Sequence, residues 1–307
     1  MKIQKSFDVP ILFIVFDRPN TTKKVFSVIK KIRPSKLFIA ADGPRKNKIG
    51  EKDKCEKVRK IIENIDWPCE VKRLYRKKNL GCKYAVSGAI DWFFENVDEG
   101  IILEDDCLPD ITFFKFCSEM LKKYRNTSQI MHIGGTNLIS DEDLMNDSYY
   151  FSRSPLVWGW ATWKRAWKYY DVNLNDLSKT EKVILDNYSL SLMDKLYWHF
   201  IFKEAHDNMI NTWDYQWVYS IWKNKGVTII PNVNLVKNIG FLKTATHTKN
   251  AIPIAKNSKT HKIHFPLRYS KDIIINRKKD VELSKKGFNI NLISIAYLIL
   301  SGLVNNI

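Results

Sequence analysis

Three acidic residues, Glu104, Asp105 and Asp106, directly follow the apolar run Ile101–Leu103. Adjacent carboxylates repel one another and raise each other's pKa, so the arrangement needs a positive partner. Oxygen ligands that leave coordination positions open for phosphate and water are typical of Mg²⁺ and Mn²⁺ sites. The alternative is that one acid caps the helix expected from Ile111, but a cap needs only one acid. The position of the cluster after a strand-like segment therefore favours a divalent metal site.

Asp214 is the second candidate for chemistry, because it lies between Trp213 and Tyr215 in the segment Thr212–Trp217. Aromatic neighbours exclude water, which raises the pKa of a carboxyl group, and aromatic rings commonly stack on sugars. Such an aspartate can act as a general base that accepts a proton from an attacking hydroxyl group. The alternative is that Asp214 caps a helix over Tyr215–Asn224. We expect the catalytic role.

Tryptophans are concentrated in the second half, where Arg153–Trp167 reads RSPLVWGWATWKRAW. Trp158, Trp160 and Trp163 could form a platform for stacking on a sugar, although burial in the core is the more common fate of a single tryptophan. We expect this half to bind the acceptor, with Trp158, Trp160 and Trp213 as candidate contacts.

Short apolar runs alternate with amphipathic stretches in the first half, which is the pattern of a parallel sheet covered by helices. The expected strands are Pro10–Phe16, Lys36–Ala41, Glu70–Tyr75, Gly100–Leu103 and Ile130–Ile133. The expected helices are Thr21–Ile32, Lys52–Asn64, Tyr84–Asn96 and Ile111–Tyr124. The sequence therefore predicts an α/β protein with a doubly wound, mainly parallel sheet.

Polar residues follow three of these strands: Asp17 and Arg18, Asp42 and Gly43, and Glu104–Asp106. In doubly wound sheets, ligands bind beyond the carboxyl ends of the strands, because loops and helix N-termini converge there. We therefore expect all three sets to line one crevice.

Several segments together resemble a known enzyme family: DVPILFIVFDRPNTTKKV, IAADGPR, NLGCKYAVSGAIDWFF, IILEDDCLPDITFFKFC, the Trp-Gly-Trp block and TWDYQW. They occur in the order seen in N-acetylglucosaminyltransferase I and in bacterial nucleotide-diphospho-sugar transferases similar to it. The resemblance covers roughly Val9–Phe241. It implies the GT-A fold, an inverting mechanism and a manganese-dependent sugar-nucleotide donor.

The resemblance also implies roles for single residues. Arg18 resembles the family's nucleotide-contacting arginine, and Asp42 resembles the carboxylate that binds the uracil ring. Asp105 is similar to the residue near the donor ribose and sugar, and Asp106 is similar to the carboxylate that ligates the metal. Glu104 would support both from behind.

Lys83 lies near the family's basic group on the donor side and would neutralise the diphosphate, with a solvated helix lysine as the alternative. His247, in FLKTATHT, resembles a stretch after the catalytic region and would close over the diphosphate or bind the metal. An ordinary loop histidine is the alternative. The family has an aspartate pair where Asp214 is followed by Tyr215 and Gln216, so Asp214 remains the single candidate base.

Charge is distributed unevenly along the 307 residues, whose formal net charge is +17. Lys237–Lys286 holds 13 Lys and Arg against 3 Asp and Glu, so more than half of the excess lies there. The apolar run Leu292–Val304 that follows is shorter than the roughly 20 residues needed to cross a bilayer. Beside a basic segment it suits a helix on an anionic membrane surface, with a buried core helix as the alternative.

The chain is expected to consist of a donor half (1–133), an acceptor half (134–240) and a basic tail (241–307). The five cysteines include no C-x-x-C pair, so we expect reduced thiols and no structural zinc site. Val9–Phe16 is too short for a signal peptide, which favours a cytoplasmic protein, and the basic tail with its apolar end favours a peripheral position on the inner face of the membrane.

The expected function is metal-dependent, inverting transfer from a UDP-sugar to a saccharide or lipid-linked saccharide in bacterial surface polysaccharide synthesis. Mn²⁺ or Mg²⁺ is the expected cofactor, and no nucleic-acid partner is expected. One alternative is a sugar-phosphate nucleotidyltransferase, which would be expected to open with a Gly-rich loop where this chain has Phe16-Asp17-Arg18-Pro19. The other is a basic nucleic-acid-binding protein, which the charged tail permits.

Overall fold

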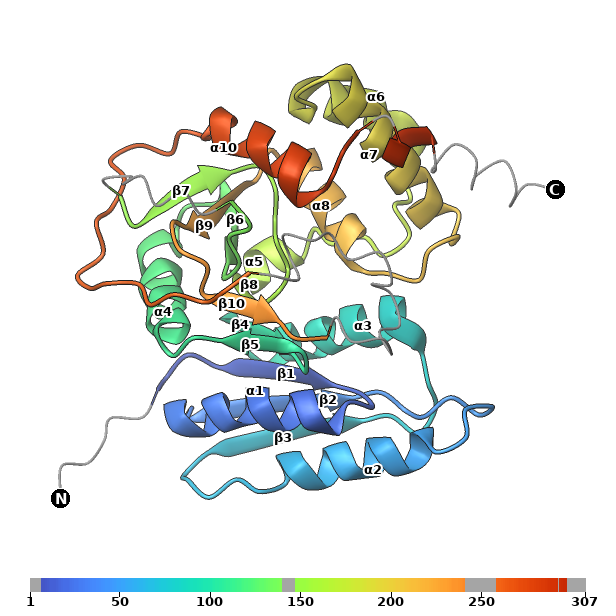
Figure 1. Cartoon of the computed structure of the whole chain (residues 1–307), viewed down its shortest axis with the longest axis vertical. Helices are drawn as coiled ribbons and strands as arrows, with labels where there is room; N and C mark the ends of the chain where they lie inside the picture. Colours follow the sequence, from blue (N-terminus) through green and yellow to red (C-terminus); the bar gives the residue numbers. More distant parts are fainter. Residues whose placement is uncertain (1–6, 140–146, 241–257, 292, 297–307) are drawn as a thin grey trace.

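Strands and helices alternate regularly along the first half of the chain (Figure 1). The computed structural model describes residues 7–139, 147–240, 258–291 and 293–296. The strands are β1 (Ile11–Val15), β2 (Lys36–Ala41), β3 (Glu70–Tyr75), β4 (Glu99–Glu104), β5 (Cys107–Pro109), β6 (Ile130–Gly134), β7 (Tyr149–Ser152), β8 (Trp160–Trp163), β9 (Val227–Pro231) and β10 (Val236–Asn238). The helices are α1 (Pro19–Ile32), α2 (Glu51–Ile62), α3 (Gly81–Asn96), α4 (Thr112–Tyr124), α5 (Lys164–Trp167), α6 (Leu177–Tyr188), α7 (Leu192–His206), α8 (Asp214–Lys223) and α10 (Arg277–Glu282), which continues into a π-helical turn over Leu283–Gly287.

One sheet of eight strands runs through both halves, in the order β3-β2-β1-β4-β8-β6-β9-β7. Neighbouring strands from β3 to β4 are parallel, and β6 is parallel to β9. The strand β8 is antiparallel to both of its neighbours, β4 and β6, and β7 is antiparallel to β9. The predicted α/β architecture with a doubly wound, mainly parallel sheet is confirmed.

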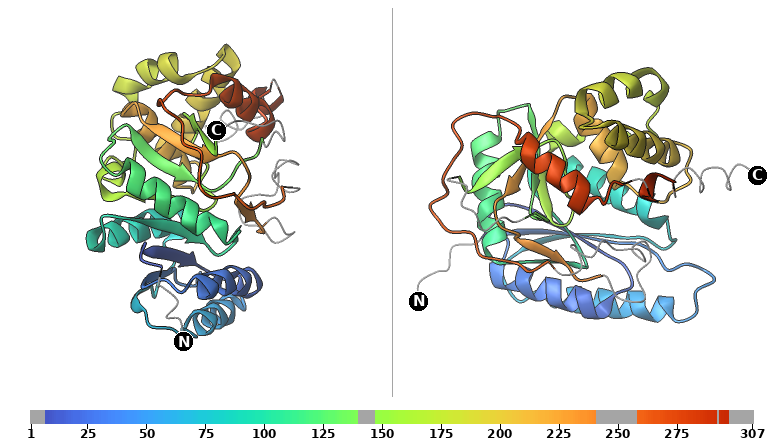
Figure 2. Two further views of the ribbon diagram at one scale, coloured as in Figure 1. Left: turned by 90° about the vertical axis from the view of Figure 1, so that its left-hand side faces the viewer. Right: turned by 45° about the horizontal axis from the view of Figure 1, so that its top comes forward.

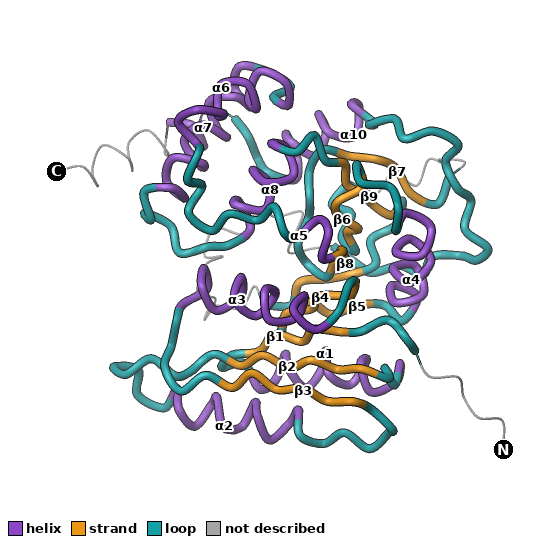
Figure 3. The backbone as a smooth tube through the Cα atoms, turned by 180° about the vertical axis from the view of Figure 1, so that it is seen from behind, coloured by secondary structure: helices purple, strands orange, loops and turns teal. Residues whose placement is uncertain are grey.

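Alternate residues of β1 belong to two different cores, because successive side chains of a strand point to opposite faces. Ile11 and Phe13 pack in the core that includes α1, α2 and α4. Leu12 and Ile14 pack in the core that includes α3 and the tryptophan-bearing helices α5, α7 and α8, here called the Trp-rich helices. Figures 1 and 3 show α1 and α3 on opposite faces of the sheet. Both faces are therefore covered, and the strand-end loops are left to form a site.

The first strand-end loop is fixed by the start of α1. Pro19 occupies the first turn of this helix, where its missing N–H and fixed φ angle suit a helix start. The carbonyl oxygen of Arg18 accepts hydrogen bonds from Thr22 N at 3.0 Å and from Thr22 Oγ1 at 2.7 Å. The backbone of Arg18 is therefore held at the carboxyl end of β1.

Part of the predicted basic tail lies against the folded body. Residues 258–291 pass beside α4, where Ile263 N donates to Thr112 Oγ1 at 3.2 Å, and then return as α10 (Figure 2). Asp280 of α10 is fully buried beside Arg153, and Ser152 Oγ donates to its Oδ1 at 2.5 Å. Arg153 Nη2 also pairs with Asp194 Oδ2 of α7 at 2.8 Å. A buried ionic cluster thus ties the C-terminal segment to β7 and α7.

Within the described ranges, no helix has both the length and the apolar character needed to cross a bilayer. Most of the predicted apolar helix over Leu292–Val304 lies outside the described residues. All five cysteines are free, as predicted.

Candidate active site

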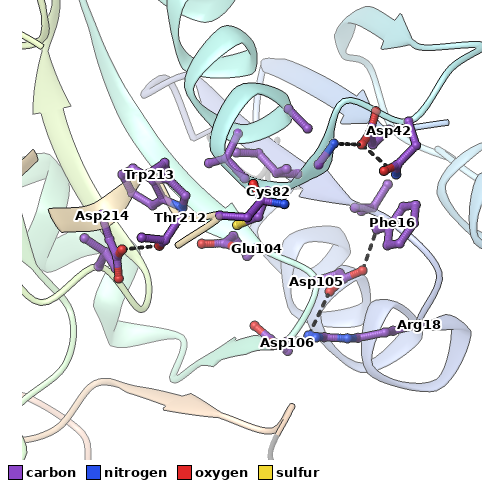
Figure 4. Close-up of a pocket in the computed structure, with 18 of the residues that line it drawn as sticks. Phe16, Arg18, Asp42, Cys82, Glu104, Asp105, Asp106, Thr212, Trp213 and Asp214 are labelled. Carbon is purple, nitrogen blue, oxygen red and sulfur yellow. Dashed lines mark hydrogen bonds and ion pairs between the residues drawn. The ribbon is translucent and has the colours of Figure 1, made fainter. Parts of the chain in front are cut away.

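A cavity of about 290 Å³ lies at the carboxyl ends of β1, β2 and β4. Figure 4 shows the acidic cluster on one side of it and the start of α8 on the other. Arg18, Asp42 and Glu104–Asp106 all line the cavity, and they come from three different strand ends. The single crevice predicted from the strand-end rule is therefore confirmed for these residues, whereas Asp17 and Gly43, which the rule predicts to line it as well, do not line it.

Backbone and side-chain donors hold two members of the acidic cluster in place. Phe16 N donates to Asp105 Oδ2 at 2.9 Å, which joins the ends of β1 and β4. Asn238 Nδ2 of β10 approaches Asp106 Oδ1 at 3.5 Å. In the part of the chain that the structure describes, no group donates a hydrogen bond to the Glu104 carboxylate, which faces the cavity.

Ionisation of the cluster is opposed by its surroundings. Burial raises the pKa of Glu104 to about 8, and the negative charges of Asp106, Asp105 and Asp214 add to the effect. Burial and the neighbouring Asp106 raise the pKa of Asp105 to about 7, against the attraction of Arg18. A bound cation would reverse this cost, because it stabilises the ionised form of each carboxylate.

Arg18 points from the start of α1 into the cluster (Figure 4). Its Nη1 forms a hydrogen-bonded ion pair with Asp106 Oδ2 and lies 3.8 Å from Asp105 Oδ1. The side chain is 30% exposed, so a ligand in the cavity can still reach the guanidinium group.

The strand β10 closes the other side of this ion pair. It pairs antiparallel with β5, so that Asn238 lies opposite Cys107, and Ile239 N donates to the carbonyl oxygen of Asp106 at 2.7 Å. A Cβ atom on the next residue, Gly240, would overlap Asp106 Oδ2 and would lie 3.0 Å from Arg18 Nη1. A larger residue at this position would therefore have to shift the Asp106 carboxylate.

Asp42 anchors the start of α3. Its carboxylate accepts hydrogen bonds from Leu80 N at 3.0 Å and Gly81 N at 3.2 Å, and from Asn79 Nδ2 at 2.9 Å. Burial raises the pKa of Asp42, and these backbone donors oppose the rise. The side chain lines the cavity while it fixes the loop before α3, so a contact with a nucleobase stays a prediction.

Asp214 is the first residue of α8 and lines the cavity opposite the acidic cluster (Figure 4). Its Oδ1 accepts a hydrogen bond from Thr212 Oγ1 and another from Tyr215 N at 3.0 Å. The helix begins one residue earlier than predicted, and its N-cap residue is Trp213, so Asp214 is not the N-cap. The catalytic role of Asp214 stays a prediction.

The structure does not bring Lys83 to the cavity. Its ammonium group donates to Asn208 Oδ1 at 2.7 Å and lies 3.4 Å from the carbonyl oxygen of Ala205, so it joins α3 to the loop after α7. Lys83 is buried and therefore not solvated, and it is not among the residues that line the cavity, so the structure does not support its predicted contact with the diphosphate.

The three predicted aromatic contacts separate into two groups. Trp160 is fully buried in β8, where its ring stacks on those of His132 and Trp213 at centroid distances of 5.0 and 5.6 Å. The predicted contact of Trp160 with a sugar is therefore wrong, and this residue belongs to the core. Trp158 and Trp213 do line the cavity. His247, the second predicted metal ligand, lies outside the described residues.

Several cavity residues were not predicted. Arg45 lies in the loop after β2, where its guanidinium group is 5.5 Å from the centre of the Phe16 ring, and it pairs with Glu51. Its position in the loop that follows a predicted strand is the sequence signal for it. Asn79 and Asn238 carry no such signal, because short polar loop residues are common and the strand β10 has only three residues.

The residues present fit a cation that is bound partly by substrate. Among the described residues, no three His, Cys, Asp or Glu side chains come together to hold one ion. Asp105 and Asp106 would supply one or two oxygen ligands, and phosphate oxygens and water would supply the rest, which is the usual arrangement for Mg²⁺. A guanidinium cation already lies against these two carboxylates, which shows that the position accepts positive charge.

No protein-family model and no curated protein matches this chain. Solved structures that resemble it include HddC from Yersinia pseudotuberculosis, with a TM-score of 0.34 and 10% identity over 51% of this chain and 77% of that chain. They also include 4-diphosphocytidyl-2C-methyl-D-erythritol synthase from Anaerococcus prevotii, with a TM-score of 0.30 and 10% identity over 63% of this chain and 84% of that chain. At these values neither likeness transfers a substrate or a residue role.

The predicted glycosyltransferase activity is corrected by this comparison. Neither structure is named as a glycosyltransferase, so the comparison gives the predicted activity no support. The physical reason for the error is that a doubly wound sheet and strand-end carboxylates can serve either chemistry. The resemblance to N-acetylglucosaminyltransferase I therefore reduces to its coarser part, a Rossmann-like, doubly wound sheet.

Proposed function

We propose that this chain is an enzyme that binds a nucleoside phosphate in the strand-end cavity and, within that class, a sugar-phosphate nucleotidyltransferase. A phosphate oxygen of the sugar phosphate attacks the α-phosphorus of a nucleoside triphosphate. The bond from that phosphorus to the β-bridging oxygen breaks, and pyrophosphate leaves with the electron pair. The observation that carries the proposal is the convergence of Arg18 with Glu104–Asp106 on one wall of the cavity.

Two arginines would hold the triphosphate. The first βα turn, Phe16-Asp17-Arg18-Pro19, contains no glycine, so its backbone does not form a Gly-rich phosphate loop. Arg18 and Arg45 both line the cavity, and the planar guanidinium group matches the geometry of phosphate oxygens. Phe16, beside Arg45, offers an aromatic surface at the same end.

Asp106, with Asp105 beside it, would hold a divalent cation that neutralises charge on the phosphates. The other end of the cavity would take the sugar phosphate. Thr212 and Asp214 lie there at the start of α8, and their oxygen atoms suit hydrogen bonds to sugar hydroxyl groups. Trp213 adds an apolar ring surface beside them.

The test is an assay of each nucleoside triphosphate with a panel of sugar 1-phosphates, in the presence of Mg²⁺ or Mn²⁺ and in EDTA. We expect release of pyrophosphate together with formation of a nucleotide sugar, and loss of both in EDTA. The reverse reaction, which makes nucleoside triphosphate from nucleotide sugar and pyrophosphate, should also occur.

Arg45→Met is a suitable variant in this assay, because it removes one of the two arginines and leaves the acidic cluster intact. It should raise the KM for the triphosphate. The proposal would be rejected if the purified protein consumed nucleotide sugars in the panel but neither released nor used pyrophosphate.

A further inference from the structure

Both oxygens of the Asp106 carboxylate are occupied by protein groups. Oδ2 is paired with Arg18 Nη1, while Asn238 Nδ2 and Cys107 Sγ each lie 3.5 Å from Oδ1. The backbone at Gly240 closes the remaining side of the ion pair, since even a Cβ atom there would overlap Oδ2. The carboxylate expected to bind a cation is therefore engaged by an arginine.

We propose that Arg18 is an internal counter-ion of the acidic cluster, which a divalent cation displaces from Asp106 and which then binds the phosphates of the nucleotide. This inference rests on the proposed function, because it concerns the same carboxylates and the same ligand. It adds that the bare protein is held in a paired state, and that metal and nucleotide bind cooperatively through one side chain.

Charge and space both require the displacement. A guanidinium group and a divalent cation repel each other, and they would compete for the same carboxylate oxygen, Asp106 Oδ2. Arg18 is the more mobile of the two partners, because its backbone alone is fixed by α1 and its side chain is 30% exposed to the cavity. Asp106 is buried and is held on its other oxygen.

Once it is released from Asp106, the Arg18 guanidinium group can bind the phosphates of a nucleotide in the cavity. A nucleotide in the cavity brings phosphate oxygens to the wall that Arg18 already lines, and arginine binds such oxygens with two parallel hydrogen bonds. If the metal raises the affinity for the nucleotide by a given factor, the nucleotide raises the affinity for the metal by the same factor, because the coupling is reciprocal. Arg18 should therefore contribute to nucleotide binding only when the metal is present.

The first measurement is the affinity of the full chain for Mn²⁺ alone, followed by the paramagnetic resonance signal of the free ion. Removing the internal competitor by Arg18→Met should tighten Mn²⁺ binding about tenfold, within the usual range for coupling between two ligands. Arg18→Lys, which keeps a positive charge, should stay close to the wild type. Arg73→Met is the matched control, because it removes the same charge from an exposed arginine of β3 that does not line the cavity. It should leave the Mn²⁺ affinity unchanged.

The second measurement is UTP binding by isothermal titration calorimetry, in EDTA and at saturating Mn²⁺. Arg18→Met should leave UTP affinity in EDTA almost unchanged and weaken it about tenfold with Mn²⁺ present. An arginine that simply contacts phosphate would weaken binding under both conditions, and that result would overturn the inference.

Equal or weaker Mn²⁺ binding by Arg18→Met would also overturn the inference, while leaving the proposed function standing. If neither the wild type nor Arg18→Met bound Mn²⁺, the cation of the proposed function would fall together with the inference. Thermal unfolding of each variant, before titration, establishes that the protein compared is folded.

Discussion

At the scale of single residues, the carboxylates of the cavity are held where ionisation is costly. Asp105 is nearly inaccessible to solvent, and Glu104 receives no hydrogen bond from any described group. Only one guanidinium group, that of Arg18, pairs with the cluster among the described residues. An arrangement of this kind is expected where charge is to be neutralised by a ligand, because functional sites are where perturbed pKa values concentrate.

Asp106→Asn should abolish the improvement in nucleotide binding that Mn²⁺ gives, because an amide oxygen is a much weaker ligand for a hard cation than a carboxylate. The measurement is UTP affinity with and without Mn²⁺. Asp53→Asn, which removes an exposed acid on α2, is the control and should behave as the wild type. Retention of the Mn²⁺ effect by Asp106→Asn would exclude Asp106 as a ligand.

Glu104→Gln should stabilise the metal-free protein at pH 8 and have little such effect at pH 5. Burial holds the pKa of Glu104 at about 8, above its ordinary value, so the folded state retains a proton that the unfolded state loses. The free energy of unfolding of the wild type therefore falls as pH rises between these values, and glutamine removes this loss. Urea unfolding in EDTA at both pH values measures it. A stability difference that does not change with pH would show that Glu104 ionises normally.

At the scale of elements, the first half could be predicted from the sequence because its periodicity is clear. The predicted bounds of all five expected strands lie within one residue of the observed bounds. The rule that ligands bind beyond the carboxyl ends of the strands located Arg18, Asp42 and the acidic cluster. The sequence could not show β8, because all four of its residues are buried and it therefore lacks the alternation of polar and apolar residues that marks a half-exposed strand. The sequence also could not show where the Lys83 side chain points, because tertiary packing decides which side of a helix faces a distant loop.

The buried ionic cluster around Arg153 should make α10 essential to the fold. Asp280→Ala leaves Arg153 without one of its two carboxylates and Ser152 without its acceptor, so the free energy of unfolding should fall by ~3–5 kcal/mol. Urea denaturation measures the change. Asp272→Ala removes an exposed acid from the same segment and should have little effect. Equal stability of the two variants would show that the cluster adds nothing to the fold.

At the scale of the whole molecule, the two predicted halves share one sheet. The strand β8 lies between β4 and β6, although it follows both of them in the sequence. The core that contains α3 is completed by tryptophans from β8 and α8. The cavity combines strand ends from the first half with residues 211–214, so neither half carries the site alone.

A fragment of residues 1–133 should therefore fail to fold as a stable unit. Its strand β4 would have an unpaired edge where β8 belongs, and the face that packs on the Trp-rich helices would be exposed to water. Far-ultraviolet circular dichroism and size-exclusion chromatography of the purified fragment test this expectation. A soluble monomer with cooperative thermal unfolding would contradict it.

The ribosome synthesises β8 after β4, its neighbour in the sheet, and this order affects folding during synthesis. During synthesis, β4 leaves the ribosome about 60 residues before β8. At ordinary rates of translation, the edge of β4 and the apolar face of the sheet therefore stay exposed for several seconds. Nascent chains halted within this interval should recruit a ribosome-associated chaperone. Those halted after β8 has left the exit tunnel should bind less.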